Sequence, residues 1–263
     1  MPTAIPSVAT FADPVISQPF DPERQPAKAG AFWLRRDIVR GVFAPMERLK
    51  VEQLVQFYGI GHSPVREAII LLLSSGLVMH EHLKGYRVSP VSLADYDDVL
   101  GVYQRLYKLA LDMALDRGDE AWEESVVVQL HRSMKVAQAL PHGDIEDRER
   151  WQRAYGMLHS ALLSGCGSPL LMQLFEDIGG RLERYVHLFG DLDSDVGRDI
   201  HAEHRRIVEA VVARDHQRVP SLIEGYFEIG QPIRDSIIAK LKADTPKRRR
   251  RRSVPETFAA AAE

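Results

Sequence analysis

A change in the spacing of apolar residues near residue 77 most limits what this chain can fold into. Before that point apolar residues recur at helical spacing in three short segments, and after it they alternate as in a β-hairpin. No strand pattern returns after Ser92. Three helices followed by a hairpin within about sixty residues predict a winged helix-turn-helix. The helical segments are 28–42, 51–58 and 63–75, and the strand segments are 77–79 and 86–88.

The junction between the second and third segments predicts a tight helix-helix turn. Gly59 and Gly61 flank Ile60, so two turn-permissive residues surround one apolar side chain that can plug the corner. Ser63 is expected to cap the third helix, with Pro64 at the first helical position, where a missing amide hydrogen costs nothing.

The second half of the chain has only helical periodicity, so the predicted fold class is mainly α: an N-terminal winged helix-turn-helix followed by an all-helical bundle. Glycine and proline breaks divide the bundle into six expected helices, at 92–116, 120–139, 145–164, 168–189, 197–213 and 216–242. The expected domains are a flexible arm at 1–27, a DNA-binding domain at 28–90, a helical domain at 91–242 and a disordered basic tail at 243–263.

Composition agrees with a two-domain globular protein. The chain has 263 residues, of which 45% are hydrophobic, which is enough for one large and one small core. No uninterrupted apolar run approaches the roughly 18 to 20 residues of a membrane span, and no signal pattern opens the chain, so we expect a cytoplasmic protein. The single cysteine, Cys166, can form no internal disulfide and is interpreted as a packing residue.

Charge is distributed unevenly along the chain. Segment 28–90 has nine Lys and Arg against five Asp and Glu, whereas 91–246 has eighteen against twenty-seven. A positive N-terminal segment followed by a negative one is typical of a protein that binds phosphate with one face. Lys247 begins a run of six cations, which can add sequence-independent DNA affinity or remain a solvated tail without a role.

The amino end of the third helix is the expected DNA-reading element. In a helix-turn-helix this end enters the major groove, and here it carries His62, Ser63 and Arg66. The positive end of the helix dipole also favours phosphate. Arg66 can pair with guanine or phosphate in two-pronged fashion. The alternative is that Arg66 pairs with a surface acid such as Glu67.

The hairpin is expected to add contacts from the wing. Lys84 and Arg87 surround the turn residue Gly85, a shape that can follow the DNA backbone or enter the minor groove. Charge on a hairpin tip can also be simply solvated. We also count Arg35, on the first helix, among the expected DNA contacts.

These motifs carry a family resemblance. GIGHSPVREAI at 59–69, SGLV at 75–78 and KGYRV at 84–88 resemble the DNA-binding module of GntR-type transcriptional regulators. The helical remainder looks like the FadR-type C-terminal ligand domain of that family, in its shorter, VanR-like form. Members usually have Ser-Arg-Thr where this chain has residues 61–63, which removes one expected contact. The resemblance implies an operator-binding homodimer, a repressor, whose helical domain binds a small-molecule effector.

Two histidines in the helical domain match positions at which many FadR-type domains bind a divalent metal. They are His159 and His204, but the aspartate and third histidine expected of such a site correspond here to Tyr155 and Tyr226. Two histidines alone are a poor zinc site, so we expect no cofactor, with Zn²⁺ kept as an alternative if His201 joins them. A lone inward histidine is more often a hydrogen-bonded core residue.

Two further tyrosines, Tyr103 and Tyr107, stand where the family often has arginine and glutamate. If all four phenols share one cavity, its effector is expected to be aromatic or largely apolar. Alternatively, the tyrosines only fill space. For the whole protein, the alternatives to a ligand-controlled regulator are an architectural DNA-binding dimer without a ligand and an enzyme. We expect no enzyme, because no nucleophile-base pair, phosphate loop or complete metal set is present.

Overall fold

The computed structural model describes residues 21–137, 145–189, 199–229 and 231–244. Most of the expected arm and nearly all of the expected basic tail lie outside these ranges. So do the predicted helix ends at 138–139 and 197–198.

The N-terminal part forms the winged helix-turn-helix. Its elements are α1 Pro26–Val39, β1 Arg48–Leu49, α2 Val51–Tyr58, α3 His62–Ser74, β2 Val78–Glu81 and β3 Gly85–Val88. The strands pair antiparallel in the order β1-β3-β2. Strand β1 was not predicted from the sequence, because two residues are too few to show an alternating pattern. The module has one buried core, in which Leu34 and Ile38 of α1 meet Ile69 of α3 and Val88 of β3.

The turn between α2 and α3 has the expected glycines, but the helix start differs from the prediction. Gly59 ends α2 with a left-handed φ of 66°, a conformation that favours glycine. The cap of α3 is Gly61, whose carbonyl accepts the first helical bond from Val65 at 3.1 Å. Ser63 therefore lies inside the first turn and does not cap it; its hydroxyl donates to Glu67 at 3.2 Å. Ile60 packs against the core as predicted.

Seven helices follow in the described part of the chain, rather than the six expected. They are α4 Leu93–Arg117, α5 Glu120–Ala137, α6 Ile145–Ser164, α7 Pro169–Phe189, α8 Ile200–Val212, α9 Arg218–Ile229 and α10 Gln231–Asp244. The prediction of one helix over 216–242 was wrong, because that segment is divided between α9 and α10. Gly230 weakens a helix, and Pro232 fits a first turn but not an interior.

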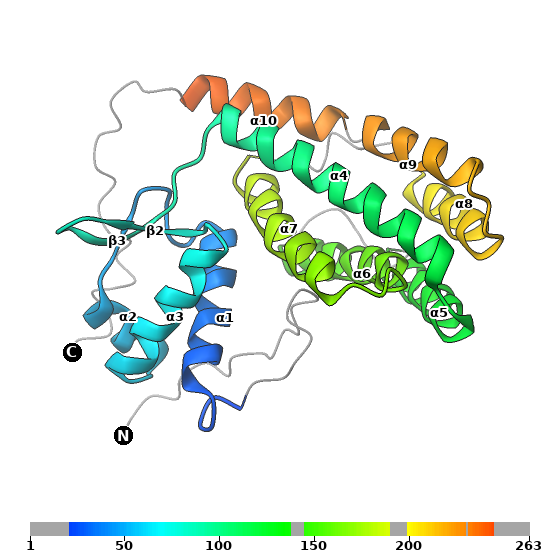
Figure 1. The fold of residues 1–263 in the computed structure, drawn as a ribbon. Coiled ribbons are helices and arrows are strands. Elements are labelled where there is room, and N and C mark those ends of the chain that lie inside the picture. The colour runs from blue at the N-terminus through cyan, green and yellow to red at the C-terminus, as the bar shows by residue number, and fades with distance from the viewer. Residues whose placement is uncertain (1–20, 138–144, 190–198, 230, 245–263) are drawn as a thin grey trace.

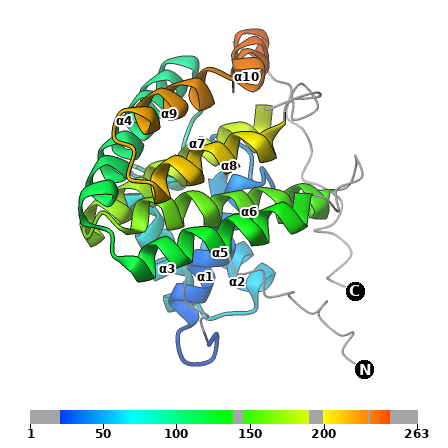
Figure 2. The same ribbon diagram turned by 90° about the vertical axis from the view of Figure 1, so that its right-hand side faces the viewer.

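The winged module lies at one side of the bundle, beside α7 (Figure 1). Contacts between α1 and α7 join the two parts, and α10 packs against α4 and α7. Figure 2 shows α5 and α6 running side by side along the bundle. The main helical core is centred on Tyr107, Leu111, Leu158 and Ile207. None of the described helices combines the length and apolar character needed to cross a membrane.

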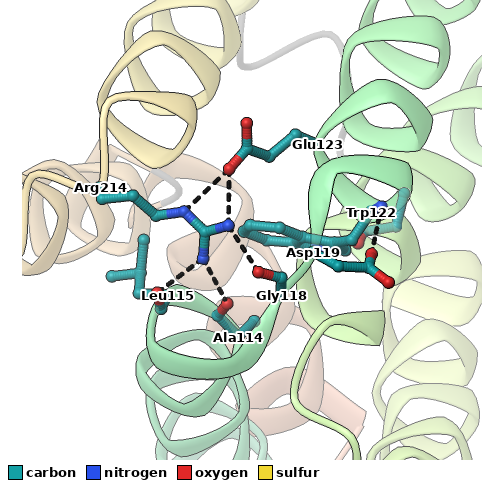
Figure 3. A network of polar contacts seen from close by, with 8 residues as sticks. Ala114, Leu115, Gly118, Asp119, Trp122, Glu123 and Arg214 are labelled. Carbon is teal, nitrogen blue, oxygen red and sulfur yellow. Dashed lines mark hydrogen bonds and ion pairs between the residues drawn. The ribbon is translucent and has the colours of Figure 1, made fainter.

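An arginine in the turn after α8 binds the end of α4 (Figure 3). Arg214, which has a left-handed φ of 54°, donates to the carbonyls of Leu115 at 2.7 Å and Gly118 at 2.6 Å. It also donates to Glu123 at 2.9 Å and covers the ring of Trp122 at 4.8 Å. The last carbonyls of a helix lack partners within that helix, so Arg214 supplies them from a distant part of the chain.

Candidate DNA-reading surface and the buried histidine-tyrosine cluster

The amino end of α3 is exposed, as a reading element must be. His62, Ser63 and Arg66 all lie on the surface in its first two turns. Within the described residues Arg66 makes no ion pair, and Glu67 is engaged by Ser63 instead. The surface pairing of Arg66 with Glu67 that we considered is therefore not seen, and its guanidinium is available to an incoming acceptor.

The wing presents its expected cations, but they are already paired. Lys84 and Arg87 both bind Glu81, with N···O distances of 2.5 Å and 2.6 Å. Arg87 also donates to the carbonyl of Met46 at 3.0 Å. These two cations hold the pKa of the Glu81 carboxyl below its usual value, mainly through the hydrogen bonds from Lys84 and then Arg87. Gly85 starts β3 with a φ of 84°.

Glu81 is a residue of the wing whose pairing the sequence did not indicate. The sequence places Glu81 in the hairpin. Its pairing with two cations, however, depends on the strand register, in which Glu81 lies opposite Gly85.

Arg35 does not share the DNA-reading surface, so its assignment as a DNA contact is corrected. Its side chain is buried in the joint between α1 and α7, where a Cβ on Gly180 would collide with the guanidinium. Asp177 on α7 interacts with its charge. The sequence placed Arg35 on an amphipathic helix but could not show that α7 covers that face.

The two predicted histidines meet in the centre of the bundle. His159 lies on α6 and His204 on α8, and their Nε2 atoms are 3.1 Å apart. The Tyr107 hydroxyl is 2.8 Å from His159 Nδ1, and the Tyr226 hydroxyl is 3.0 Å from His159 Nε2. His204 Nδ1 lies 2.8 Å from the carbonyl of Ile200. Four helices thus contribute one continuous polar chain.

The partners in this chain assign the protons. The Ile200 carbonyl can only accept, so His204 carries its proton on Nδ1 and offers Nε2 as an acceptor. With both rings neutral, His159 then accepts at Nδ1 from the Tyr107 hydroxyl and carries its proton on Nε2, which faces both His204 Nε2 and the Tyr226 hydroxyl. Both rings can therefore be neutral while every ring nitrogen has a partner, which buried polar groups require.

Aromatic rings surround this polar chain. The Tyr155 ring packs at a tilt beside His204 with ring centres 4.6 Å apart, and Tyr103 stacks on Phe175 at 4.8 Å. Phe227 packs edge-on to Tyr107 at 5.4 Å. Three of the four tyrosines singled out from the sequence lie against the two histidines, and Tyr103 joins them through Tyr107. We call these six residues the histidine-tyrosine cluster; that they line a ligand cavity stays a prediction.

The cluster does not fit a divalent metal. Across the ranges that the structure describes, no three His, Cys, Asp or Glu side chains converge as metal ligands, so His201 does not complete a set with His159 and His204. Burial raises the pKa of Tyr107 well above its ordinary value, which favours the neutral phenol. Two imidazoles and neutral hydroxyls are a weaker donor set than zinc sites use.

Comparison with known proteins places these features in a family. The model of the bacterial regulatory proteins of the gntR family matches residues 32–88, and the FCD domain model matches residues 98–228. A transcriptional repressor of Escherichia coli, GlaR, is 30% identical over 78% of this chain and 93% of its own length. The uncharacterised regulator BphR of Paraburkholderia xenovorans is 31% identical over 74% of this chain and 79% of its own length.

Solved structures agree on the fold. A GntR regulator from Rhodococcus sp. RHA1 superposes with a TM-score of 0.60 at 22% identity, covering 79% of this chain and 97% of its own. Escherichia coli McbR/YncC superposes with a TM-score of 0.62 at 18% identity, covering 81% of this chain and 97% of its own.

Proposed function

Because this chain belongs to the gntR family of bacterial regulatory proteins and carries an FCD domain behind its winged module, we propose that it represses transcription as a two-fold dimer. It is a DNA-binding transcriptional regulator with an effector-binding domain. Repression is supported by the likeness to GlaR, which is named a repressor. A dimer is supported by geometry, because one short recognition helix contacts too few base pairs to select an operator and paired half-sites overcome this limit.

The exposed amino end of α3 carries the proposal for DNA recognition. The Arg66 guanidinium has no internal partner within the described residues, and a two-pronged donor of this kind suits guanine or phosphate. His62 and Ser63 lie beside it on the same end. Arg87 and Lys84 would reach the DNA only by exchanging Glu81 for phosphate. The wing is therefore expected to contribute less affinity than its charge indicates.

The histidine-tyrosine cluster carries the proposal for the effector. The Tyr107 and Tyr226 hydroxyls and the two imidazoles lie within hydrogen-bond distance of one another, and the rings of Tyr103 and Tyr155 add aromatic surface. Such a lining favours an aromatic or largely apolar ligand, recognised by stacking and a few neutral hydrogen bonds. We propose that binding requires no metal, because the donor set is incomplete.

A fluorescence anisotropy titration tests the proposal with DNA from upstream of the protein's own coding region. Specific binding that an aromatic metabolite weakens, with no requirement for added Zn²⁺, would support it. A response only to short carboxylic acids in the presence of Zn²⁺ would contradict the effector assignment. Specific binding that no ligand changes would favour an architectural dimer, and turnover of a metabolite without DNA affinity would favour an enzyme.

Arg66→Ala is the decisive variant for DNA recognition. Loss of a two-pronged contact is expected to weaken operator binding by about 1–3 kcal/mol, roughly five- to 150-fold. Arg205→Ala, which removes the same charge from an exposed position on α8, should leave operator affinity unchanged. Equal affinity of the folded Arg66→Ala protein and the wild type would remove α3 from the recognition surface.

A further inference from the structure

A pocket of about 220 Å³ lies at the joint between the winged module and the helical domain. The winged module contributes the turn between α3 and β2, α4 and α7 contribute residues of the opposite wall, and the segment linking β3 to α4 completes the lining. Its lining includes Gly76, Ser89, Asp95, Arg181, Arg184 and Tyr185. This pocket has no part in the recognition surface or in the histidine-tyrosine cluster described above.

Arg184 is a buried cation with an unused donor in this pocket. Arg184 is only 3% exposed, and its Nη2 donates to the Ser89 carbonyl at 2.8 Å. Its Nε atom is buried and has no acceptor within the described part of the chain. Burial lowers the Arg184 pKa to about 10, which still leaves the guanidinium charged at neutral pH. A buried charge with few acceptors is costly, so negative charge in the adjoining pocket would stabilise this guanidinium.

Arg181 adds a second guanidinium to the same pocket. The Arg181 guanidinium packs against Gly76: a Cβ atom added to this glycine would lie 3.5 Å from Arg181 Nη1. Arg181 Nη2 binds the Asp95 carboxylate at 2.5 Å. The Tyr185 hydroxyl donates to the other Asp95 oxygen at 2.6 Å. Asp95 is thus neutralised by its own partners, and two arginines against one aspartate leave the pocket with one net positive charge.

We propose that this joint binds a small oxyanion, whose carboxylate or phosphate oxygens face the guanidinium groups of Arg184 and Arg181. Guanidinium groups bind both kinds of oxyanion through charge-assisted hydrogen bonds. A volume of about 220 Å³ accommodates inorganic phosphate or a short organic acid and is smaller than a drug-sized site.

The site is separate from the proposed effector site, although both lie along α7. Phe175, which packs in the histidine-tyrosine cluster, precedes Arg184 by nine residues, or roughly 14 Å along the helix axis. A bound oxyanion would touch both the DNA-binding module and the helical domain, and so would fix their relative placement. This second role rests on the proposed function, whereas binding of the anion does not.

Thermal unfolding of the full-length protein without DNA tests the site, using sodium phosphate, sodium acetate and sodium chloride at matched ionic strength. We expect a saturable rise in Tm with phosphate or acetate relative to chloride. A rise in Tm with phosphate alone would identify the ligand group as a phosphate, and a rise with acetate alone would identify it as a carboxylate. A rise with both would mean that the site accepts either group. No saturable rise with either anion overturns the proposal. Because no DNA is present, failure here is distinct from failure of the operator assay.

Variants locate the binding. Arg184→Met should weaken the anion's apparent affinity by about tenfold or more, and Arg184→Lys should recover part of it. Arg205→Gln, with the same loss of charge on α8, should behave as the wild type. Unchanged anion affinity in Arg184→Met overturns the site. If that variant does not fold, hydrogen exchange of the wild type decides: the anion should slow exchange at 89–95, and protection confined to other segments overturns the site.

Discussion

At the scale of single residues, Tyr107 shows how a phenol in a bundle core becomes part of a polar network. Its side chain is fully buried, its ring packs against Phe227 and its hydroxyl faces His159 Nδ1 at 2.8 Å. His159 in turn faces His204. Removing one hydroxyl therefore affects a chain of buried groups that cannot reach water, and the proton assignment along that chain depends on it.

Tyr107→Phe is expected to lower the free energy of unfolding by about 1–3 kcal/mol, because it leaves the buried acceptor of His159 without a donor. Tyr103→Phe is the matched control, since the Tyr103 hydroxyl has no hydrogen bond within the described residues and its ring stacking on Phe175 survives the change. Urea unfolding of both variants measures the difference. Equal losses would show that the hydrogen bond to His159 adds nothing beyond ring packing.

At the scale of secondary-structure elements, the wing is a hairpin whose charge is internally compensated. Glu81 on β2 pairs with one cation from the turn and one from β3. The end of α4 is another element completed from outside, because Arg214 provides donors for its last carbonyls. Each case can be tested by one substitution.

Glu81→Gln should strengthen binding to DNA of any sequence, because it removes a negative charge near the backbone and releases Lys84 and Arg87. Each released cation that neutralises a phosphate is expected to add about 0.9 to the slope of log affinity against log salt. Glu209→Gln, on the exposed face of α8, is the matched control. The measurement is anisotropy with random-sequence duplex over a salt series. A slope equal to that of the wild type would mean that the wing does not meet phosphate.

Arg214→Met should destabilise the protein by about 1–3 kcal/mol, because it leaves the carbonyls at the end of α4 without their donors while its stem still covers Trp122. Arg218→Met, an exposed position at the start of α9, should change stability by less than about 0.5 kcal/mol. Thermal or urea unfolding compares them. A stability of Arg214→Met that matches the control would show that water replaces the guanidinium at no cost.

At the scale of the whole molecule, charge separates the DNA-binding end from the body. The winged segment 28–90 is positive, the segment 91–246 is negative, and six cations follow from Lys247. Such a distribution orients the molecule toward a duplex through its N-terminal face and holds the body away. The basic tail lies outside the described residues, so its contribution rests on its charge alone.

Deletion of 245–263 is expected to flatten the dependence of log affinity on log salt, by up to about 0.9 for each tail cation that contacts phosphate in the full chain. Operator preference should be retained, because the tail carries no base-reading geometry. Anisotropy with operator and random duplexes, each over a salt series, separates the two effects. If the slope is unchanged, the tail is a solvated extension.

The sequence by itself determined the fold class, because helical and strand periodicities follow from which residues must face a core. It also located Gly59, the exposed end of α3 and the two inward histidines, since each depends on local pattern. It misplaced the start of α3 because Ser63 and Gly61 can both begin a helix. It joined α9 to α10 because periodicity alone does not weigh Gly230 and Pro232.

Only the tertiary structure decided which side chains meet. The pairing of Lys84 and Arg87 with Glu81 depends on strand register, and the burial of Arg35 depends on α7 packing over α1. The chain from Tyr107 through His159 to His204 joins residues up to about a hundred positions apart. The unused donor of Arg184 arises only where two domains close around it. Local periodicity reports the face that a residue occupies, whereas long-range packing selects its partner.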